Sequence, residues 1–233
     1  MKQDNFIREL KKLNIQLTET QLLQLEIYYE MLVEYNKIMN LTGITEHDEV
    51  FLKHFYDSLT IVKIIDLNTV ESFCDIGTGA GFPGLVIKIC FPKLKVTLLD
   101  SLNKRVEFLK AVIQKLNLKD IEVVHARAEE YALSHRSEFD VTTARAVAHT
   151  SILLEYAIPM TKVEKYFVAM KANVEEELKE IDNALKKLST KLIQKEEFLL
   201  PLENSKRTIL LFKKEKENKH FPRKNNEIKK NRL

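Results

Sequence analysis

The sequence predicts an α/β fold in which a doubly wound, mostly parallel sheet ends in an antiparallel hairpin and is preceded by a helical N-terminal extension. From residue 70 onward, short apolar runs alternate with helical patterns, which is typical of a parallel sheet covered by helices. The last two apolar runs, residues 191–200 and 207–214, are separated by a turn too short for a crossover helix. Strands joined in this way must be antiparallel.

The N-terminal sixty-odd residues have a helical pattern. Thr18 and Gln21 form the T-x-x-Q signature of a capped helix start. Apolar side chains then recur at helical spacing, and we expect them to pack against the main domain: Leu22, Leu25, Tyr29 and Leu32. A second set of side chains gathers within about two helical turns further along: Lys53, His54, Asp57 and Ser58.

The alternating region gives a definite order of elements. Strands are expected at residues 70–76, 94–100, 121–126, 139–145 and 164–171. Helices are expected over residues 81–91, 103–116 and 173–188, with Asn173 as the N-cap of the last one. We therefore divide the chain into a helical extension over residues 1–66, a main domain over residues 67–214 and a tail over residues 215–233.

Positive charge is concentrated in the tail. The whole chain has a net charge of +3, whereas residues 213–233 contain nine Lys/Arg and only three Glu. Such a segment either binds phosphates through counterion release or is a solvated, mobile chain end, and charge alone leaves both open.

Several function classes are disfavoured by what the sequence lacks. There is no apolar run long enough to cross a bilayer and no apolar segment typical of a signal peptide, so we expect no membrane partner. Cys74 and Cys90 lie among apolar neighbours. They are expected to be reduced, buried thiols of a cytoplasmic protein and not a disulfide or a metal site.

A glycine-rich stretch, CDIGTGAGFPG, follows the first predicted strand and contains four of the five glycines. From Gly79 it spells G-x-G-x-x-G, the dinucleotide fingerprint. From Asp75 it spells D-x-G-x-G-x-G, the pattern found where S-adenosylmethionine binds. In the nicotinamide fingerprint, the first glycine should come directly after the strand. Gly77 has that position, but a G-x-G-x-x-G pattern that begins at Gly77 would need its third glycine where Phe82 stands.

Two carboxylates and the hairpin favour the methyl donor. Asp75 ends the strand, where it can fix the turn or meet the amino group of the ligand. Asp100 closes the second strand and is placed to accept hydrogen bonds from ribose hydroxyls, although this suits either cofactor. A terminal antiparallel hairpin is a hallmark of methyltransferases. A nicotinamide-dependent oxidoreductase stays the alternative, as does a glycine turn that serves packing alone.

Motifs that the chain lacks exclude several classes of methyl acceptor. Methylation of an adenine amine usually employs an Asn/Asp-Pro-Pro-aromatic turn after the fourth strand, where this chain has TARAV. Methylation of a pyrimidine C5 needs a cysteine nucleophile, and neither cysteine is well placed. No set of carboxylates suggests a metal site. Arg145 remains, and it can bind phosphate, a guanine edge or the cofactor. Guanine N7 carries no proton, so its methylation needs alignment and no general base.

The motifs DIGTGAGFPG, LLDSLNKRVEFL, ARAEE and TARAV, in this order and spacing, closely resemble the bacterial 16S ribosomal RNA 7-methylguanosine methyltransferases, also called the glucose-inhibited division protein B family. YNKIMNLTGI and KHFYDSL resemble the N-terminal signature of that family. The resemblance covers nearly the whole chain. It implies a Rossmann-like class I methyltransferase fold, S-adenosylmethionine as donor, and N7 methylation of a guanosine of the G527 type in 16S ribosomal RNA.

The resemblance also implies roles for particular residues. Gly77 and Phe82 would line the cofactor loop, Ala128 and Glu129 would flank the adenine, and Arg145 would close the site as the catalytic residue. The residues expected to contact the cofactor are Asp75, Gly77, Gly79, Phe82, Asp100, Ser101, Ala128, Glu129 and Arg145. Those expected to contact RNA are Lys53, His54, Arg223 and Lys224. For His54 the equal alternative is a hydrogen bond to a partner within the core.

The chain departs from the family pattern at two places. Ala172 follows Lys171 where the family often has glycine, and the tail HFPRKNNEIKKNRL lacks the expected glycine and late proline. The expected partner is 16S ribosomal RNA or the small ribosomal subunit, with the protein acting as a monomer. A ribosome-assembly factor that binds RNA without activity remains the non-enzymatic alternative.

Overall fold

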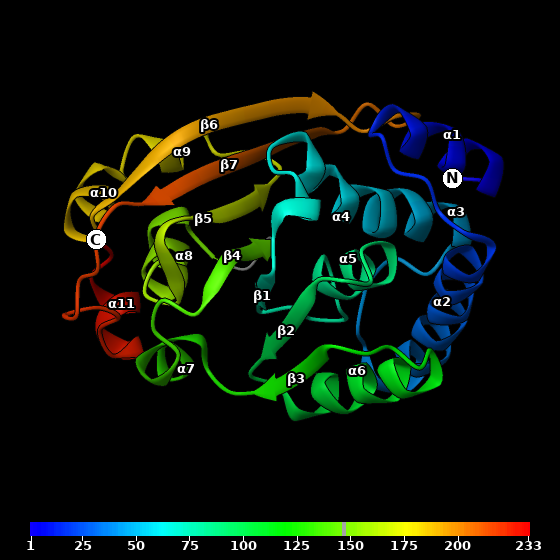
Figure 1. Ribbon diagram of the computed structural model, residues 1–233, viewed down its shortest axis with the longest axis horizontal. Coiled ribbons are helices and arrows are strands. Elements are labelled where there is room, and N and C mark those ends of the chain that lie inside the picture. The colour runs from blue at the N-terminus through cyan, green and yellow to red at the C-terminus, as the bar shows by residue number, and fades with distance from the viewer. Residues whose placement is uncertain (146–147) are drawn as a thin grey trace.

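The computed structural model describes residues 1–145 and 148–233 and contains a seven-stranded sheet with helices on both faces (Figure 1). The strand order is β3-β2-β1-β4-β5-β7-β6. The order reverses between β1 and β4, which creates the switch point where open α/β sheets bind ligands. The predicted doubly wound, mostly parallel sheet is therefore confirmed. The strands are β1 Ser72–Ile76, β2 Lys95–Asp100, β3 Ile121–His125, β4 Phe139–Arg145, β5 Thr161–Lys171, β6 Thr190–Leu199 and β7 Lys206–Lys214.

The central parallel strands β1, β2 and β4 are largely buried, whereas the edge strands β3 and β6 are half-buried or exposed over most of their length. All residues of β4 before Arg145 are buried, as expected for a strand covered on both faces. The strands β6 and β7 pair antiparallel, from Thr190 opposite Lys214 to Leu199 opposite Lys206, which confirms the predicted hairpin. Residues of β6 are mostly exposed or half-buried because this strand forms the edge of the sheet.

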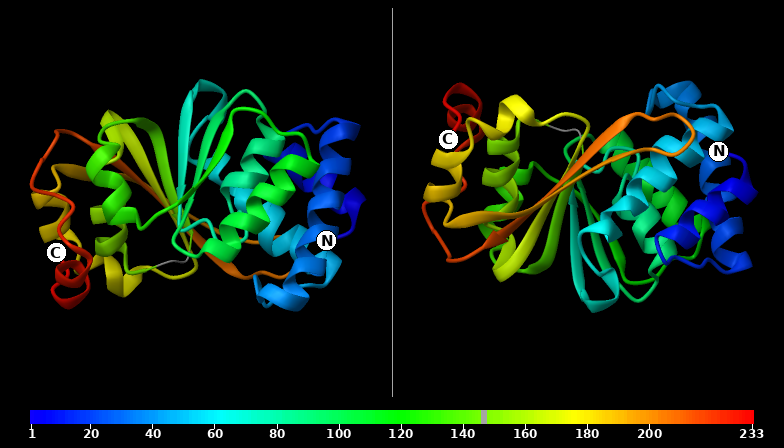
Figure 2. Two further views of the ribbon diagram at one scale, coloured as in Figure 1. Left: turned by 90° about the horizontal axis from the view of Figure 1, so that it is seen from below. Right: turned by 90° about the horizontal axis from the view of Figure 1, so that it is seen from above.

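Helices pack on the sheet from two sides, as the two views of Figure 2 show. The N-terminal helices lie with α5 and α6 on one face, and α7 to α11 lie on the other. The helix bounds are α1 Gln3–Lys12, α2 Glu19–Met39, α3 His47–Val50, a π-helix Phe51–Tyr56, α4 Asp57–Leu59, α5 Gly84–Cys90, α6 Asn103–Lys115, α7 Ala128–Ser134, α8 Thr150–Ala157, α9 Glu175–Leu178, α10 Asp182–Lys187 and α11 Asn225–Lys230. Short 3₁₀ turns cover Thr60–Lys63 and Leu67–Thr69.

The predicted capping box at the start of α2 is confirmed. The Gln21 backbone N–H donates to Thr18 Oγ1 at 3.2 Å, and the Thr18 backbone N–H donates to Gln21 Oε1 at 2.9 Å. The buried stripe of this helix contains Tyr28, whereas the predicted Tyr29 lies half-buried and donates its hydroxyl to the Thr45 carbonyl. Tyr29 still packs against the core, as expected, and Tyr28 is the fully buried tyrosine that the sequence analysis did not name.

The helix expected over residues 173–188 is wrong as a single element. It is split into α9 and α10 because tertiary contacts hold its two halves separately. Glu177 in α9 accepts hydrogen bonds from Thr150 and Lys171, whereas Ile181 and Ala184 pack in the core beneath the sheet. The start at Asn173 is partly right, since its side chain accepts a hydrogen bond from the Glu175 N–H at 3.2 Å.

The two faces of the sheet give two apolar cores. Cys74 and Cys90 are both buried and free, as expected. No helix in the described part of the chain is long and apolar enough to cross a membrane. The division at residues 66/67 and 214/215 stays a prediction.

Candidate cofactor and acceptor pockets

The glycine-rich turn connects β1 to α5 through three glycines with positive φ, namely Gly77, Gly79 and Gly81. The backbone N–H of Gly77 donates to the Leu99 carbonyl at 2.8 Å, so the turn begins against the end of β2. Gly84 has an ordinary φ, but a Cβ there would lie 2.4 Å from Leu98 Cδ2. Glycine is therefore required here by conformation at the turn and by close packing at the start of α5.

Asp75 lies beneath this turn and fixes its shape. Its Oδ2 accepts hydrogen bonds from Thr78 Oγ1 at 2.6 Å and from the Gly84 N–H at 2.8 Å. The side chain is fully buried, and this burial raises its pKa to about 6. Its Oδ1 has no hydrogen-bond partner within the described residues. Of the two roles considered for Asp75, the structure shows the turn-fixing one, and the contact with the amino group of the ligand stays a prediction.

The first of two cavities opens where β1, β2 and β3 end. Its lining brings together five of the residues predicted to contact the cofactor: Gly77, Asp100, Ser101, Ala128 and Glu129. The other side of this cavity is formed from α8 and α11, by Ala148, Ile152, Tyr156 and Lys229. We call this the cofactor-side cavity.

Asp100 holds the glycine turn against the end of β2. Its Oδ2 accepts the Gly79 N–H at 2.9 Å and lies 3.4 Å from Arg105 Nη1, while its Oδ1 accepts the Leu102 N–H at 2.9 Å. Gly79 itself does not line the cavity. Its predicted contact with the cofactor is thus replaced by a hydrogen bond that positions the carboxylate.

Glu129 lies in the first turn of α7, where the helix dipole favours a carboxylate. Its Oε1 accepts a hydrogen bond from Arg127 Nε at 2.6 Å, and its side chain is only 7% exposed. This ion pair keeps a buried negative charge compensated next to the cavity. Ala128 and Glu129 both line the cavity, and their contact with an adenine stays a prediction.

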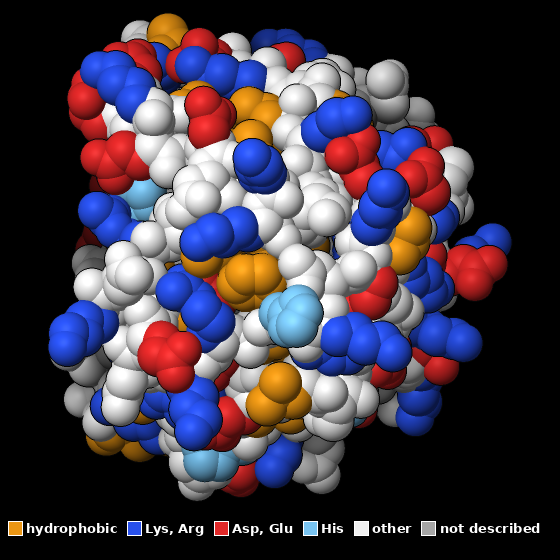
Figure 3. Space-filling view, turned by 90° about the vertical axis from the view of Figure 1, so that its left-hand side faces the viewer, with side chains coloured by type: hydrophobic (Ala, Val, Ile, Leu, Met, Phe, Trp, Pro, Cys, Tyr) orange, Lys and Arg blue, Asp and Glu red, His pale blue; other side chains and the backbone are white. Residues whose placement is uncertain are grey.

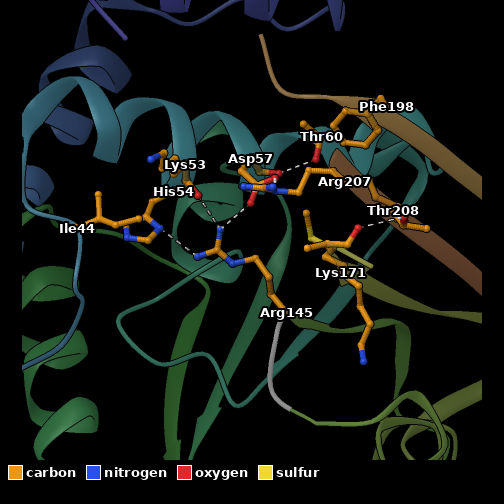
Figure 4. A pocket seen from close by; sticks show the side chains of 13 residues that line it. Ile44, Lys53, His54, Asp57, Thr60, Arg145, Lys171, Phe198, Arg207 and Thr208 are labelled. Carbon is orange, nitrogen blue, oxygen red and sulfur yellow. Dashed lines mark hydrogen bonds and ion pairs between the residues drawn. The ribbon is translucent and has the colours of Figure 1, made fainter. Parts of the chain in front are cut away.

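The second cavity, of about 300 Å³, collects basic side chains from distant parts of the chain (Figure 4). Asp57 lies at its centre. Arg145 Nη1 lies 3.2 Å from Asp57 Oδ2, and Arg207 Nε lies 3.0 Å from Asp57 Oδ1. Lys53 and Lys171 line the same cavity. Two guanidinium groups thus share one buried carboxylate, and the cavity keeps an excess of positive charge. We call it the acceptor-side cavity.

His54 is held in this cavity as a neutral imidazole. Its Nε2 lies 2.9 Å from Thr42 Oγ1, and its ring stacks on Phe82 with centroids 4.4 Å apart. Burial and the neighbouring charge of Arg145 lower the pKa of His54 to about 3. Ser58 Oγ donates to the His54 carbonyl at 2.5 Å. Of the two possibilities for His54, the structure shows the hydrogen bond within the fold.

Three residues predicted to contact the cofactor or RNA have other surroundings in the structure, and those contacts stay predictions. The ring of Phe82 packs between Tyr28 and His54 under Arg145, so Phe82 does not line the cofactor-side cavity. Arg145 likewise lines the acceptor-side cavity. Arg223 is bound to the buried Glu155 through Nε at 2.9 Å and Nη2 at 2.7 Å, so its guanidinium is occupied within the fold. Lys224 is exposed. The last two residues of the motif TARAV lie outside the described residues.

Several residues of these cavities were missed by the sequence analysis. Arg207 is the second residue of β7 and is separated from Asp57 by 150 positions, so no local pattern connects the two. Lys171 donates to Glu177 Oε2 at 2.5 Å and to the Ala148 carbonyl at 2.7 Å, which ties β5 to the start of α8. The one sequence signal for Lys171 as a lining residue of the acceptor-side cavity is its position at the end of a strand.

Comparison with known proteins decides the family. The model of the GidB family, described as rRNA small subunit methyltransferase G, matches residues 21–210. The chain belongs to the GidB family. Ribosomal RNA small subunit methyltransferase G of Lysinibacillus sphaericus (strain C3-41) is 47% identical over 228 residues, which cover 96% of each chain. The enzyme of the same name from Ligilactobacillus salivarius (strain UCC118) is 48% identical over 231 residues, again 96% of each chain.

Solved structures agree with the GidB assignment at the level of the fold. A SAM-dependent methyltransferase from Aquifex aeolicus is 20% identical and superimposes with a TM-score of 0.53, covering 72% of this chain and 93% of that one. The mitomycin 7-O-methyltransferase MmcR is 15% identical, with a TM-score of 0.58 over 80% of this chain and 60% of that one. The predicted family, the Rossmann-like methyltransferase fold and S-adenosylmethionine as donor are confirmed.

Proposed function

We propose that this member of the GidB family transfers a methyl group from S-adenosylmethionine to N7 of a guanosine in 16S ribosomal RNA, at a site of the G527 type. The observation that carries this proposal is the pairing of two cavities at the switch point of the sheet. Arg145 lines one of them, and Ala148, only three positions later, lines the other. A donor in the first cavity and a nucleotide in the second would meet at the end of β4.

The residues of the cofactor-side cavity fit the chemistry of the donor. The Asp100 carboxylate and Ser101 suit ribose hydroxyls, and the backbone at Ala128 and Glu129 suits an adenine edge. Asp75 Oδ1, a buried acceptor without a partner in the described chain, fits a donor such as the ammonium group of the cofactor or a water bound to it. When bound, S-adenosylmethionine supplies an electrophilic methyl group on a sulfonium.

The acceptor-side cavity suits a nucleotide whose reacting atom carries no proton. Arg145 can donate to guanine O6 or to a phosphate from a guanidinium that Asp57 holds in place. His54, with its pKa of about 3, is a poor base and stays neutral beside that guanidinium. Attack by N7 needs only alignment, since no proton has to be removed first. This fits the absence of an aligned strong base among the described lining residues.

Exposed lysines on one side of the molecule support RNA as the substrate. Figure 3 faces this side, over which Lys and Arg side chains are spread. The helices α10 and α11 lie there and contribute exposed lysines, with Lys224 preceding α11: Lys186, Lys187, Lys229 and Lys230. We propose phosphate contacts for Lys224 and retain Lys53 and His54 as neighbours of the bound nucleotide. Lys53 is partly neutralised by Glu49 at 2.7 Å and Glu203 at 3.3 Å.

The test is methyl transfer from isotopically labelled S-adenosylmethionine to free 16S ribosomal RNA and to small subunits that lack the modification. We expect one methyl group per RNA on a guanosine. Strand cleavage by aniline after borohydride reduction would place it at N7, and mass spectrometry of the fragments would locate the nucleotide. A methyl group on another base or another guanosine atom would refute the proposal. Transfer to neither substrate would favour an RNA-binding protein without activity.

A further inference from the structure

The end of the chain is tied to the fold and is not a loose basic tail. We call residues 215–233 the C-terminal strap. Its first anchor is Glu217, which accepts hydrogen bonds from Ser137 Oγ at 2.6 Å and from Arg136 Nη1 at 3.0 Å, and also from Lys214. These partners lie just before β4 and at the end of β7. The strap thus starts in a fixed position at the end of the sheet where β4 begins and β7 ends.

The second anchor is an ion pair with a buried carboxylate. Glu155 in α8 has a side chain that is only 1% exposed. Arg223 satisfies it with three hydrogen bonds, from its backbone N at 2.9 Å, from Nε at 2.9 Å and from Nη2 at 2.7 Å. A carboxylate this deeply buried requires a partner. The strap is therefore part of the folded structure at α8.

Beyond this anchor, α11 runs along α8 toward the end of α8 that meets the two cavities. Asn225, at the start of α11, accepts a hydrogen bond from Tyr156 near the C-terminal end of α8. Arg232 follows α11, and its Nη2 lies 3.5 Å from Glu180 Oε2. The same oxygen lies 3.5 Å from Nε2 of His149, the N-cap of α8. Ile228 is fully buried between these points. Figure 1 shows α11 beside α7 and α8.

This course brings Lys229 into the lining of the cofactor-side cavity. The lining contains two acidic side chains, Asp100 and Glu129, and two basic ones, Arg127 and Lys229. Arg127 already pairs with Glu129. Within the described residues Lys229 has no ion-pair partner, and it lines the cavity together with Ala148 and Ile152.

We propose that the C-terminal strap forms a wall of the S-adenosylmethionine pocket and that Lys229 binds the α-carboxylate of the cofactor. This rests on the proposed function, since it takes the cofactor-side cavity as the donor site. The cofactor has one anionic group, its carboxylate, whereas its sulfonium and ammonium groups repel a lysine. With the ribose at Asp100, the amino-acid end of the cofactor would extend toward the end of β4, and Ala148, which follows β4, lines the same cavity as Lys229.

The test compares two ligands that differ only in the amino-acid part. S-adenosylhomocysteine contains the carboxylate, and 5′-methylthioadenosine lacks it. Calorimetric titration of the full-length protein gives the dissociation constant of each for the natural sequence and for Lys229→Ala. A charge-assisted hydrogen bond predicts about tenfold weaker binding of S-adenosylhomocysteine by the variant and unchanged binding of 5′-methylthioadenosine. Lys230→Ala is the matched control, since Lys230 is an exposed neighbour outside the lining.

The outcomes separate the proposals. Unchanged binding of both ligands to Lys229→Ala would overturn the strap as a wall of the pocket. An equal loss for both ligands would overturn the carboxylate contact and assign Lys229 to the nucleoside. Failure of the natural protein to bind either ligand would instead refute the proposed function, and this inference with it. Recovery of S-adenosylhomocysteine binding by Lys229→Arg would support a role for the positive charge.

Discussion

The charge of the acceptor-side cavity depends on a single buried carboxylate. Asp57 accepts hydrogen bonds from Arg145 Nη1 at 3.2 Å and from Arg207 Nε at 3.0 Å, and its side chain is 8% exposed. An isolated charge would be costly at that depth, so each guanidinium both compensates Asp57 and is held by it. Arg145 Nη1 also donates to the Lys53 carbonyl at 3.2 Å, and its Nη2 lies 3.4 Å from His54 Nδ1. A guanidinium fixed in this way can bind a base edge or phosphate through its remaining N–H groups without reorganising.

Arg145→Lys tests whether this geometry serves turnover. Lysine keeps the positive charge but loses the planar fork, and Arg207 still compensates Asp57. We expect methyl transfer to fall about 100-fold, as for a misplaced substrate, while the free energy of unfolding falls by less than about 2 kcal/mol. Initial rates and urea denaturation measure the two effects. A fall in stability in proportion to the fall in rate would make Arg145 a structural residue.

His54 gives a prediction about pH. Its pKa is about 3 in the fold instead of the ordinary 6.5. Below pH 6.5 the unfolded chain therefore binds a proton that the folded chain does not, and the free energy of unfolding falls by up to about 1.4 kcal/mol per pH unit. Above pH 6.5 this effect vanishes. We expect His54→Gln to lose less stability than the natural protein between pH 6.5 and 5 in urea denaturation.

The same residue should not appear in the pH dependence of the rate. Because N7 attack needs no base and His54 remains neutral, the rate at saturating substrates should be flat between pH 6 and 8. An inflection near pH 6.5 that disappears in His54→Gln would show that the imidazole titrates in the active protein. Equal acid sensitivity of both proteins in urea would likewise argue against a lowered pKa.

Among the elements, the β1–α5 turn has the strictest steric requirement. A Cβ at Gly84 would lie 2.4 Å from Leu98 Cδ2 and 2.8 Å from Asp75 Cβ, so α5 would have to move away from the sheet. We expect Gly84→Ala to lower the free energy of unfolding by about 2–3 kcal/mol. At Gly43 an added Cβ would meet nothing within 4 Å. Gly43→Ala is thus the control, with little change expected when urea denaturation is measured for both variants, and equal effects would contradict this packing.

For the molecule as a whole, the pair between Arg223 and Glu155 joins the chain end to α8 across 68 positions. Arg223→Ala would leave a buried carboxylate without its partner. We expect a loss of about 3–5 kcal/mol in the free energy of unfolding, measured by urea denaturation. Adding Glu155→Gln should restore more than half of that loss, because it removes the unpaired charge. No recovery in the double variant would mean that Arg223 stabilises the strap mainly by packing.

The sequence alone determined the order of the strands along the chain, the antiparallel hairpin, the glycine turn and the carboxylate at the end of β2, whereas α7, α8 and α11 were not predicted. These features are local, since each is specified by residues adjacent in the chain or by an apolar period. Asp100 was predicted for the same reason, because the carboxyl ends of parallel strands must meet at one edge of the sheet. Gly77, Ala128 and Glu129 were instead indicated by the resemblance to the family.

Only the tertiary structure decided the partners across the chain. It joined Asp57 to Arg207, turned Phe82 toward His54, split the helix over residues 173–188 and bound Arg223 to Glu155. A charged side chain in a sequence has no preferred distant partner. Its environment is set by which segments the packing of apolar side chains brings together, and a buried charge then takes whichever opposite charge lies within reach. The packing therefore brought Lys229 of the strap into the lining of the cofactor-side cavity, although charge alone had left open whether this segment binds phosphates or is a mobile chain end.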